Sequence, residues 1–320
     1  MPVAPRPNFF IVGAPRCGTT SMHYYLSQHP AVYMPPVKEL HFFGRDLDPE
    51  LVYPVPADAD AYLAFFAPAG SRRGIGETSP FYLYSRTAPG EIADFSPDAR
   101  IVIMLRNPVD LMYSWFCGGR FSSAFIPAHR QLASFEAAVA GDLKPHGEVS
   151  SPDGPPRSRG RVPQSYRDLA AYAQHVKRYL DAFGRARIHV VWFDELTSAP
   201  GPVFQRICRF LEVDPGFIPD FAPRNQSRHA RVRTLVRFLI RPPPLARHLA
   251  RALVPASVRP AIRSVFWRLA VTHPPPLDPA VRCRVLPQFA DDILKLQTLL
   301  DRDLSHWLRC DEAARNVPAS

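Results

Sequence analysis

The sequence predicts an α/β fold in which a parallel β-sheet is flanked by helices. Strand-like apolar runs alternate with helical patterns along the chain, and two of these runs, FFIVG and IVIML, contain no polar side chain. A strand that is apolar on both faces is typical of a parallel sheet with helices on both sides.

The elements follow in a regular order. Strands are expected at 9–13, 101–105 and 188–193, helices follow them at 19–28, 108–116 and 202–211, and a further helix at 166–183 precedes the third strand. Residues 142–164 are rich in Gly, Pro and Ser, which predicts a mobile loop. Residues from about 228 to 277 predict a helical insert rich in Pro and Arg. The amphipathic tail at 281–307 is expected to pack back on the core, so that residues 1–320 form one domain.

Composition excludes several classes of protein. Of the 320 residues 46% are hydrophobic and 21% are charged, which is enough apolar material for a large core. No stretch approaches the roughly 18 apolar residues of a membrane-spanning helix, and the N-terminus lacks the pattern of a secretory signal. The five cysteines are widely spaced without a CxxC pair, so neither a disulfide framework nor a metal site is expected. A reducing cytoplasm is the expected location.

The positive charge is concentrated in one segment. The net charge is +10, yet residues 221–277 carry eleven arginines and no acidic residue, while the rest of the chain sums to −1. Such a segment suits an anionic ligand, a phospholipid surface or nucleic acid. An arginine-rich cover over the core is the alternative interpretation. At helical spacing the arginines form basic amphipathic pieces, which predicts weak peripheral attachment to an anionic membrane and a position beside a substrate-binding cleft.

The first strand, turn and helix predict an anion site. In FFIVG-APRCG-TTSMHYYL a buried strand is followed by a turn between Gly13 and Gly18 and then by the start of a helix. The first N–H groups of that helix and the positive end of its dipole face whatever lies in the turn, and Thr19 and Thr20 add hydroxyl donors. An ordinary strand–turn–helix corner remains the alternative.

This turn differs from the phosphate loop of an ATPase. That loop requires a lysine after its second glycine, where this chain has Thr19, and the cation lies inside the turn as Arg16. The second strand ends in Arg106 and not in an acidic residue that would help to hold Mg²⁺. The site is therefore better suited to binding a dianionic group without the help of a metal ion.

A second anion contact is expected at the end of the strand at 101–105. Arg106 follows that strand and Ser114 lies eight residues later, in a helix that begins at Pro108. Ligands of parallel α/β sheets bind at the carboxyl ends of the strands. Arg106 by charge and Ser114 by its hydroxyl could hold a phosphate there.

These motifs together resemble a known family. GAPRCGTT and RIVIMLRNPVDLMYS, with KELHFF between them, are similar to the sulfotransferases that use 3′-phosphoadenosine 5′-phosphosulfate (PAPS), most closely to the heparan-sulfate-type and bacterial members. GETSPFYL, IHVVWFDEL, FLEV and the C-terminal LLDRDLSHW extend the similarity over most of the chain. The resemblance implies an α/β fold with a P-loop-type parallel sheet.

The resemblance also implies roles for individual residues. It implies a loop that binds the 5′-phosphosulfate, formed by Arg16, Cys17, Gly18, Thr19, Thr20 and Ser21. Arg106 with Ser114 would bind the 3′-phosphate, and Glu39 falls where heparan-type members carry the general base. This chain departs from that branch at Arg16 and at Thr78, where a lysine is common in relatives, and in its adenosine loop before 272–279.

The chemistry of sulfuryl transfer fits these residue types. Arg16 would stabilise the charge that builds on the departing phosphate oxygen. Glu39 is the leading candidate for the base that takes the proton of the acceptor. His41 would lie on the same face if the chain is extended there, and is the second candidate for the base. A hydrogen-bonded structural histidine is the competing interpretation of His41.

The sequence therefore predicts a cytoplasmic, PAPS-dependent sulfotransferase that acts without a metal on a hydroxyl or amine of a carbohydrate, lipid-linked or small-molecule acceptor. A metal-dependent P-loop kinase of small molecules is the alternative. A nucleic-acid binder is the third hypothesis, but no aromatic platform accompanies the arginines of 221–277 and nucleic acid is not expected as a partner.

Overall fold

The computed structural model describes residues 5–47, 55–121, 134–141, 166–222, 229–230, 271–272 and 275–310. The loop predicted at 142–164 lies outside the described residues, as does nearly all of the helical insert predicted at 228–277.

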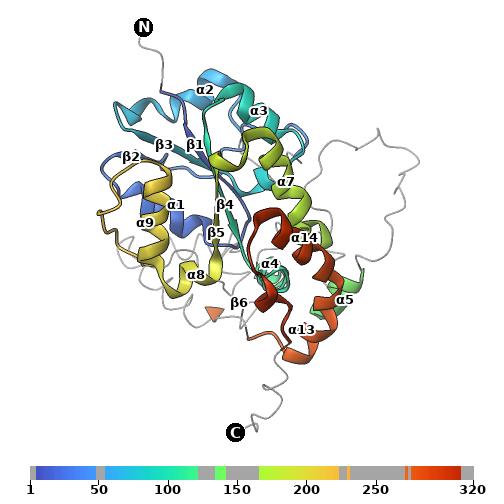
Figure 1. The fold of residues 1–320 in the computed structure, drawn as a ribbon. Coiled ribbons are helices and arrows are strands. Elements are labelled where there is room, and N and C mark those ends of the chain that lie inside the picture. Colours follow the sequence, from blue (N-terminus) through green and yellow to red (C-terminus); the bar gives the residue numbers. More distant parts are fainter. Residues whose placement is uncertain are drawn as a thin grey trace, which may run out of the picture.

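A five-stranded parallel sheet forms the centre of the described residues (Figure 1). Its strands are β1 (Phe9–Gly13), β2 (Val32–Tyr33), β3 (Gly74–Thr78), β4 (Arg100–Leu105) and β5 (Ile188–Trp192). Their order is β2-β3-β1-β4-β5, with β1 in the middle between β3 and β4. From β1 the chain first forms β2 and β3 on one side, and it then crosses to the other side of β1 to form β4 and β5. This reversal opens a crevice at the carboxyl end of β1, where parallel α/β sheets bind ligands.

Helices cover both faces of the sheet. In order they are α1 (Thr19–Ser27), α2 (Ala59–Ala64), α3 (Ala88–Phe95), α4 (Pro108–Phe121), α5 (Phe135–Gly141), α6 (Tyr166–Ala170), α7 (Tyr172–Phe183), α8 (Phe193–Ser198), α9 (Pro200–Phe210), α13 (Pro279–Val285) and α14 (Ala290–Leu300). Figure 1 shows α1, α8 and α9 on one side of the strands and α3 and α7 on the other, with α14 lying against α7. A short antiparallel pair joins β6 (His229–Ala230) and β7 (Val271–Thr272).

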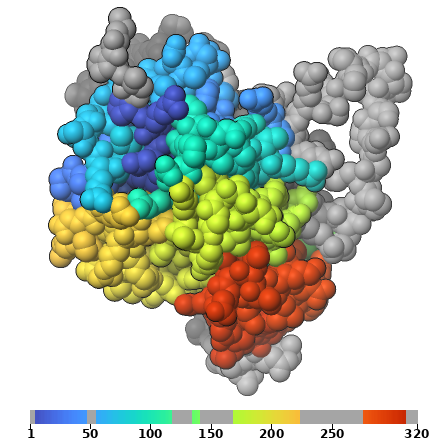
Figure 2. Space-filling view, turned by 45° about the horizontal axis from the view of Figure 1, so that its top comes forward, coloured from blue at the N-terminus to red at the C-terminus, as the bar shows by residue number. Residues whose placement is uncertain are grey.

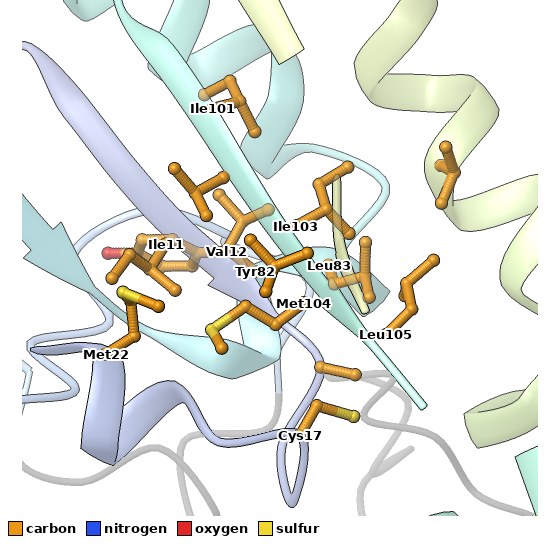
Figure 3. Close-up of a cluster of buried hydrophobic side chains, with 14 of the residues drawn as sticks. Ile11, Val12, Cys17, Met22, Tyr82, Leu83, Ile101, Ile103, Met104 and Leu105 are labelled. Carbon is orange, nitrogen blue, oxygen red and sulfur yellow. The ribbon is translucent and has the colours of Figure 1, made fainter. Parts of the chain in front are cut away.

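The core is built around β1 and β4, because both strands are apolar on both faces. Every residue of β1 is buried, and only the first residue of β4 is partly exposed. Figure 3 shows side chains of these strands packed with Met22 of α1 and with Tyr82 and Leu83, which follow β3. The predicted α/β class and the parallel sheet flanked by helices are confirmed.

Three of the strands were predictable from apolar runs, whereas β2 and β3 were not. β2 has two residues, and β3 has the sequence GIGET, in which only Ile75 has a large apolar side chain. β3 is nevertheless fully buried. Its burial depends on neighbouring strands and covering helices that are remote in the sequence, so local hydropathy gave no signal.

The helix expected at 166–183 is interrupted at Ala171, which separates α6 from α7. The expected packing of the tail is confirmed: Asp292 of α14 accepts a hydrogen bond from the Ala173 backbone N–H at 3.3 Å. Figure 2 shows the C-terminal segment, in red, against the yellow-green segment that contains α7. Within the described ranges, no helix has the length and apolar character needed to cross a membrane.

Candidate active site

The turn between β1 and α1 lies at the crevice formed by the reversal of strand order. The Ala14 N–H donates to the Met104 carbonyl of β4 at 2.6 Å, which ties the turn to the neighbouring strand. Arg16 and Gly18 have positive φ angles of 67° and 85°. A Cβ at Gly18 would lie 2.8 Å from Cδ2 of Leu196 in α8, so a side chain here would displace Leu196, and the left-handed conformation itself favours glycine.

Helix α1 begins directly at this turn. The Met22 N–H donates to the Gly18 carbonyl at 3.0 Å, so this bond closes the first turn of the helix. The N–H groups that precede it, including those of Thr19 and Thr20, belong to the first turn, which offers donors to an anion. Thr19 and Ser21 are buried, whereas Thr20 is half-buried. The strand–turn–helix arrangement predicted from the sequence is present, and its anion-binding role stays a prediction.

Three of the predicted phosphate contacts converge beside this turn. Arg16 Nε donates to Ser114 Oγ of α4 at 3.2 Å, although the two residues are 98 positions apart in the chain. Burial lowers the pKa of Arg16 below its ordinary value, and the charge of Arg106 lowers it further. Arg106 is therefore close enough to Arg16 to disfavour the charge of Arg16. An anion bound between them would relieve that repulsion.

Arg106 is held by groups that the sequence analysis did not identify. Its guanidinium carbon lies 4.5 Å from the ring centroid of Phe193, the first residue of α8. A cation over an aromatic face is attracted to it electrostatically. The next residue, Asn107, accepts the Val109 N–H at 3.0 Å with Oδ1 and so caps the start of α4. In the Arg-Asn-Pro sequence, Arg106 is thus held against Phe193 at the end of β4, and Asn107 caps the helix that carries Ser114.

Cys17 differs from its neighbours in the turn because its side chain faces the core. The thiol is fully buried, and burial raises its pKa to about 12. Figure 3 places it in the cluster that contains Met104 and Leu105. The Cys17 N–H donates to the Ala14 carbonyl at 3.3 Å. The Cys17 sulfur therefore faces the core and is not placed to contact an anion in the turn.

The loop that follows β2 brings a carboxylate and an ammonium group to the same place. Lys38 Nζ lies 3.1 Å from Thr20 Oγ1 of α1 and 2.7 Å from Glu39 Oε1. The Glu39 side chain is 41% exposed and that of Lys38 is 19% exposed. The Glu39 N–H donates to the Thr78 carbonyl at the end of β3 at 2.8 Å. The candidate base and the anion turn thus both lie at the carboxyl ends of the strands, and Lys38 links them.

His41 is placed differently from the expectation of an extended chain. Glu39 and His41 have positive φ angles of 62° and 49°, so the backbone turns there and the two side chains do not follow strand alternation. His41 is 5% exposed, and its ring contacts the rings of Phe81 and Tyr82. Neither ring nitrogen has a hydrogen-bond partner among the described residues. Burial lowers the pKa of His41 to about 4 against the opposing charge of Glu39.

Glu77 of β3 is a buried carboxyl group surrounded by hydroxyls. Ser79 Oγ and Tyr82 OH donate to its Oε1 at 2.6 and 2.8 Å, and Tyr62 OH donates to its Oε2. Burial raises the pKa of Glu77, and these three hydrogen bonds act in the opposite direction. This side chain organises its neighbours and does not reach the surface.

The same hydroxyls hold the loop that carries Glu39. Ser79 Oγ accepts the His41 N–H, and Tyr82 OH accepts the Phe43 N–H, both at 3.2 Å. A carboxylate can only accept hydrogen bonds, so Glu77 directs both hydroxyl protons toward itself and leaves their lone pairs for the loop. Glu77 therefore fixes the direction of these contacts.

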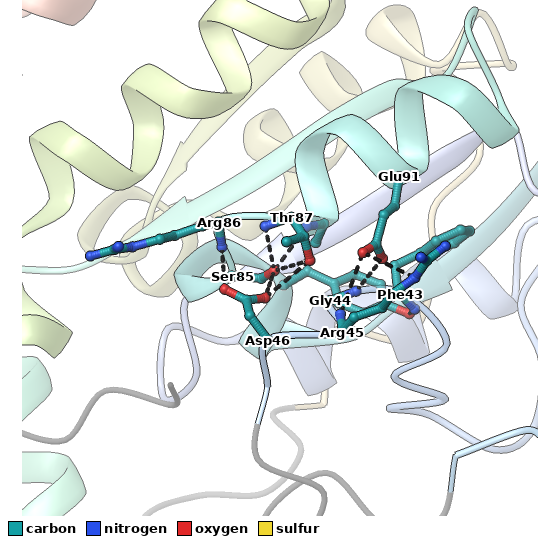
Figure 4. A network of polar contacts seen from close by, with 10 residues as sticks. Phe43, Gly44, Arg45, Asp46, Ser85, Arg86, Thr87 and Glu91 are labelled. Carbon is teal, nitrogen blue, oxygen red and sulfur yellow. Dashed lines mark hydrogen bonds and ion pairs between the residues drawn. The ribbon is translucent and has the colours of Figure 1, made fainter. Parts of the chain in front are cut away.

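The far end of the loop is anchored by a second polar network (Figure 4). Glu91 of α3 accepts the Gly44 N–H at 2.7 Å. The carboxylate of Asp46 accepts hydrogen bonds from Ser85, from the Arg86 N–H and from Thr87. Both ends of the segment around Glu39 are thus attached to β3, α3 and their connection, which makes its position well defined.

The chain is similar in sequence and in fold to known proteins. The sequence profile of the sulfotransferase domain family matches residues 6–221. A solved sulfotransferase structure from Alicyclobacillus acidocaldarius is 31% identical, with a TM-score of 0.66, and the match covers 95% of this chain and 100% of that one.

Curated relatives share part of their length with this chain. The bifunctional heparan sulfate N-deacetylase/N-sulfotransferase 2 of Bos taurus is 28% identical over 220 residues, which is 65% of this chain and 22% of the relative. The Drosophila melanogaster enzyme of this type is 23% identical over 220 residues, which is 65% of this chain and 20% of that enzyme. The chain therefore spans about a fifth of the length of these relatives.

Proposed function

This chain belongs to the sulfotransferase domain family, and from that premise we propose that it transfers a sulfuryl group from PAPS to a hydroxyl or amine of an acceptor. The donor would supply the sulfuryl group, and the protein would hold the donor and take the proton of the acceptor. Family membership favours sulfuryl transfer over the phosphotransferase alternative.

The convergence of Arg16, Arg106 and Ser114 beside the anion turn carries this proposal. Arg106 by its charge and Ser114 by its hydroxyl are suited to a phosphate dianion, and Arg16, whose Nε lies 3.2 Å from Ser114 Oγ, links this pair to the turn proposed for the 5′-phosphosulfate. A few residues away, the first turn of α1 offers N–H donors for a second anionic group. PAPS carries anionic groups at both its 3′ and 5′ positions, so the residues present fit this donor.

Glu39 is the proposed general base. Its side chain is the most exposed of the candidate groups on this loop, and its Oε1 is paired with Lys38. Its Oε2 has no hydrogen-bond partner among the described residues and can accept the proton of the acceptor. As the bond from sulfur to the phosphate oxygen breaks and that to the acceptor forms, this proton passes to Glu39. His41 is the weaker candidate, because its ring is buried and its pKa of about 4 makes it a poor proton acceptor.

The proposed acceptor class is a carbohydrate, a lipid-linked group or a small molecule. The curated relatives are named as heparan sulfate N-sulfotransferases, which supports an amine or hydroxyl of a sugar among these classes. Incubation of the purified protein with ³⁵S-labelled PAPS and an extract of its host would identify labelled products.

A binding experiment tests the proposal without knowledge of the acceptor. Adenosine 3′,5′-bisphosphate, the product left by PAPS, should raise the unfolding temperature in the presence of EDTA. A ligand at 100 times its Kd stabilises the folded state by about 2.7 kcal/mol. ATP, with Mg²⁺ present, should not raise the unfolding temperature to a comparable extent. A protein stabilised by ATP and Mg²⁺ but not by the bisphosphate would contradict the proposal.

A cytoplasmic location and weak attachment to anionic membrane remain proposals as well. The support for the attachment is the charge of residues 221–277, with eleven arginines and no acidic residue. Co-sedimentation with phosphatidylglycerol vesicles at increasing salt concentration tests the attachment. Absence of binding at low salt would contradict it.

A further inference from the structure

Lys38 occupies a position between the anion turn and the proposed base. Its Nζ lies 3.1 Å from Thr20 Oγ1 in the first turn of α1 and 2.7 Å from Glu39 Oε1. An ammonium group has three N–H donors, and these contacts use two of them. One donor remains for a ligand that enters the space between Thr20 and Glu39.

The backbone of the loop brings these two neighbouring side chains together. Successive side chains of an extended chain point to opposite faces, but the positive φ of Glu39 turns the chain at this residue. A non-glycine residue is strained in this conformation. The hydrogen bond from the Glu39 N–H to the Thr78 carbonyl and that from the His41 N–H to Ser79 hold the turn in place.

Arg16 and Lys38 serve different parts of the crevice. Arg16 contacts Ser114 of α4, on the side where Arg106 lies. Lys38 contacts Thr20 and Glu39, on the side where the acceptor's proton would be removed. Its charge also lowers the pKa of the buried ring of His23, after the larger effect of burial. The positive charge that faces the proposed base thus comes from Lys38.

We propose that Lys38 is a further catalytic residue, whose ammonium group contacts the sulfuryl group of the bound donor between Thr20 and Glu39. This inference rests on the proposed function. The ammonium group would bind sulfuryl oxygens while the sulfur moves from the phosphate oxygen to the acceptor. Its contact with Glu39 Oε1 would keep the base beside the reacting atoms, with Oε2 directed to the proton of the acceptor.

The sulfuryl group is what distinguishes PAPS from adenosine 3′,5′-bisphosphate, so the two nucleotides test the proposal by binding alone. Lys38→Met removes the charge and keeps the length of the side chain. A lost hydrogen bond to a charged group corresponds to about a ten- to 150-fold change in affinity. We expect the affinity for PAPS, measured without acceptor by displacement of the bisphosphate, to fall by that factor. The affinity for the bisphosphate should change less than threefold.

Two further variants complete the experiment. Lys177→Met removes a lysine that also pairs with a carboxylate at 2.7 Å, that of Asp181, but on the exposed face of α7. It should leave both affinities unchanged. Lys38→Arg keeps the charge and should retain part of the preference for PAPS. The unfolding temperature of each variant without ligand shows whether it is folded.

Each outcome bears on the proposal. If wild type and Lys38→Met bind PAPS with equal affinity, the proposal is overturned. It is also overturned if Lys38→Met loses affinity for PAPS and for the bisphosphate equally, because Lys38 would then contact the 5′-phosphate. If the wild-type protein binds neither nucleotide, the proposed function itself fails, which is a separate result.

Discussion

Arg106 and Ser114 should together decide whether the site prefers a nucleotide that carries a 3′-phosphate. The change to make is Arg106→Gln, alone and combined with Ser114→Ala. Adenosine 3′,5′-bisphosphate and adenosine 5′-phosphate differ only in that phosphate, so the ratio of their dissociation constants isolates its contribution.

The magnitude follows from the contacts available. A hydrogen bond to a charged group contributes about 1.5–3 kcal/mol, and 1.4 kcal/mol corresponds to a factor of ten in affinity. Arg106→Gln should therefore reduce the preference for the bisphosphate by about ten- to 150-fold. The double variant should lose more, but less than the sum of the two effects. Ser114 Oγ also accepts a hydrogen bond from Arg16 Nε, so Ser114→Ala also frees the Arg16 side chain. Residues that share a partner in this way do not contribute additively.

Isothermal titration with both nucleotides measures the ratio. Arg106 also lies over the ring of Phe193, and a control must remove a similar contact elsewhere. Arg6 lies 4.9 Å from the ring centroid of Phe95, before the amino end of β1 and thus at the opposite end of the strand from the site. Arg6→Gln should leave the preference unchanged. If Arg106→Gln is folded and keeps the wild-type ratio within threefold, the 3′-phosphate binds elsewhere and the reasoning is refuted.

Three further predictions concern the loop around Glu39 and its support. Glu39→Gln should lower turnover by about 10²–10⁴-fold with bisphosphate affinity unchanged, since a base acts on the acceptor; a loss of nucleotide affinity would instead indicate a structural role. In urea unfolding, Glu77→Leu should be several kcal/mol less stable than Glu77→Gln, because it leaves three buried hydroxyls without an acceptor at about 1–3 kcal/mol each. Similar stabilities would argue against the network. The folded-state pKa of His41 is about 4 and that of an unfolded histidine is about 6.5, so the unfolded state binds more protons between these values. The free energy of unfolding should therefore fall as the pH is lowered from 6.5 toward 4. His41→Leu should reduce this slope without abolishing it, because the pKa values of His23, His175 and His189 are also lowered to about 4; an unchanged slope would contradict the prediction.

The sequence by itself determined the centre of the fold. β1 and β4 are apolar on both faces, and the structure has them at Phe9–Gly13 and Arg100–Leu105, within one residue of the prediction. The turn between Gly13 and Gly18 and the start of α1 were also predictable, because glycine conformation and the first turn of a helix are local properties. For the same reason Arg16, Arg106 and Ser114 could be named as candidate ligands.

Tertiary structure alone decided how the candidate residues are combined. β3 has little hydropathy signal, yet its carboxyl end holds the loop of Glu39 through Thr78 and through the hydroxyls that Glu77 orients. The contact of Lys38 with Thr20 and that of Arg16 with Ser114 join segments 18 and 98 residues apart. Such contacts depend on the order of the strands and on positive φ angles at non-glycine residues such as Glu39, which are stable only when the surrounding hydrogen bonds impose them. Neither property is encoded in a short window of sequence.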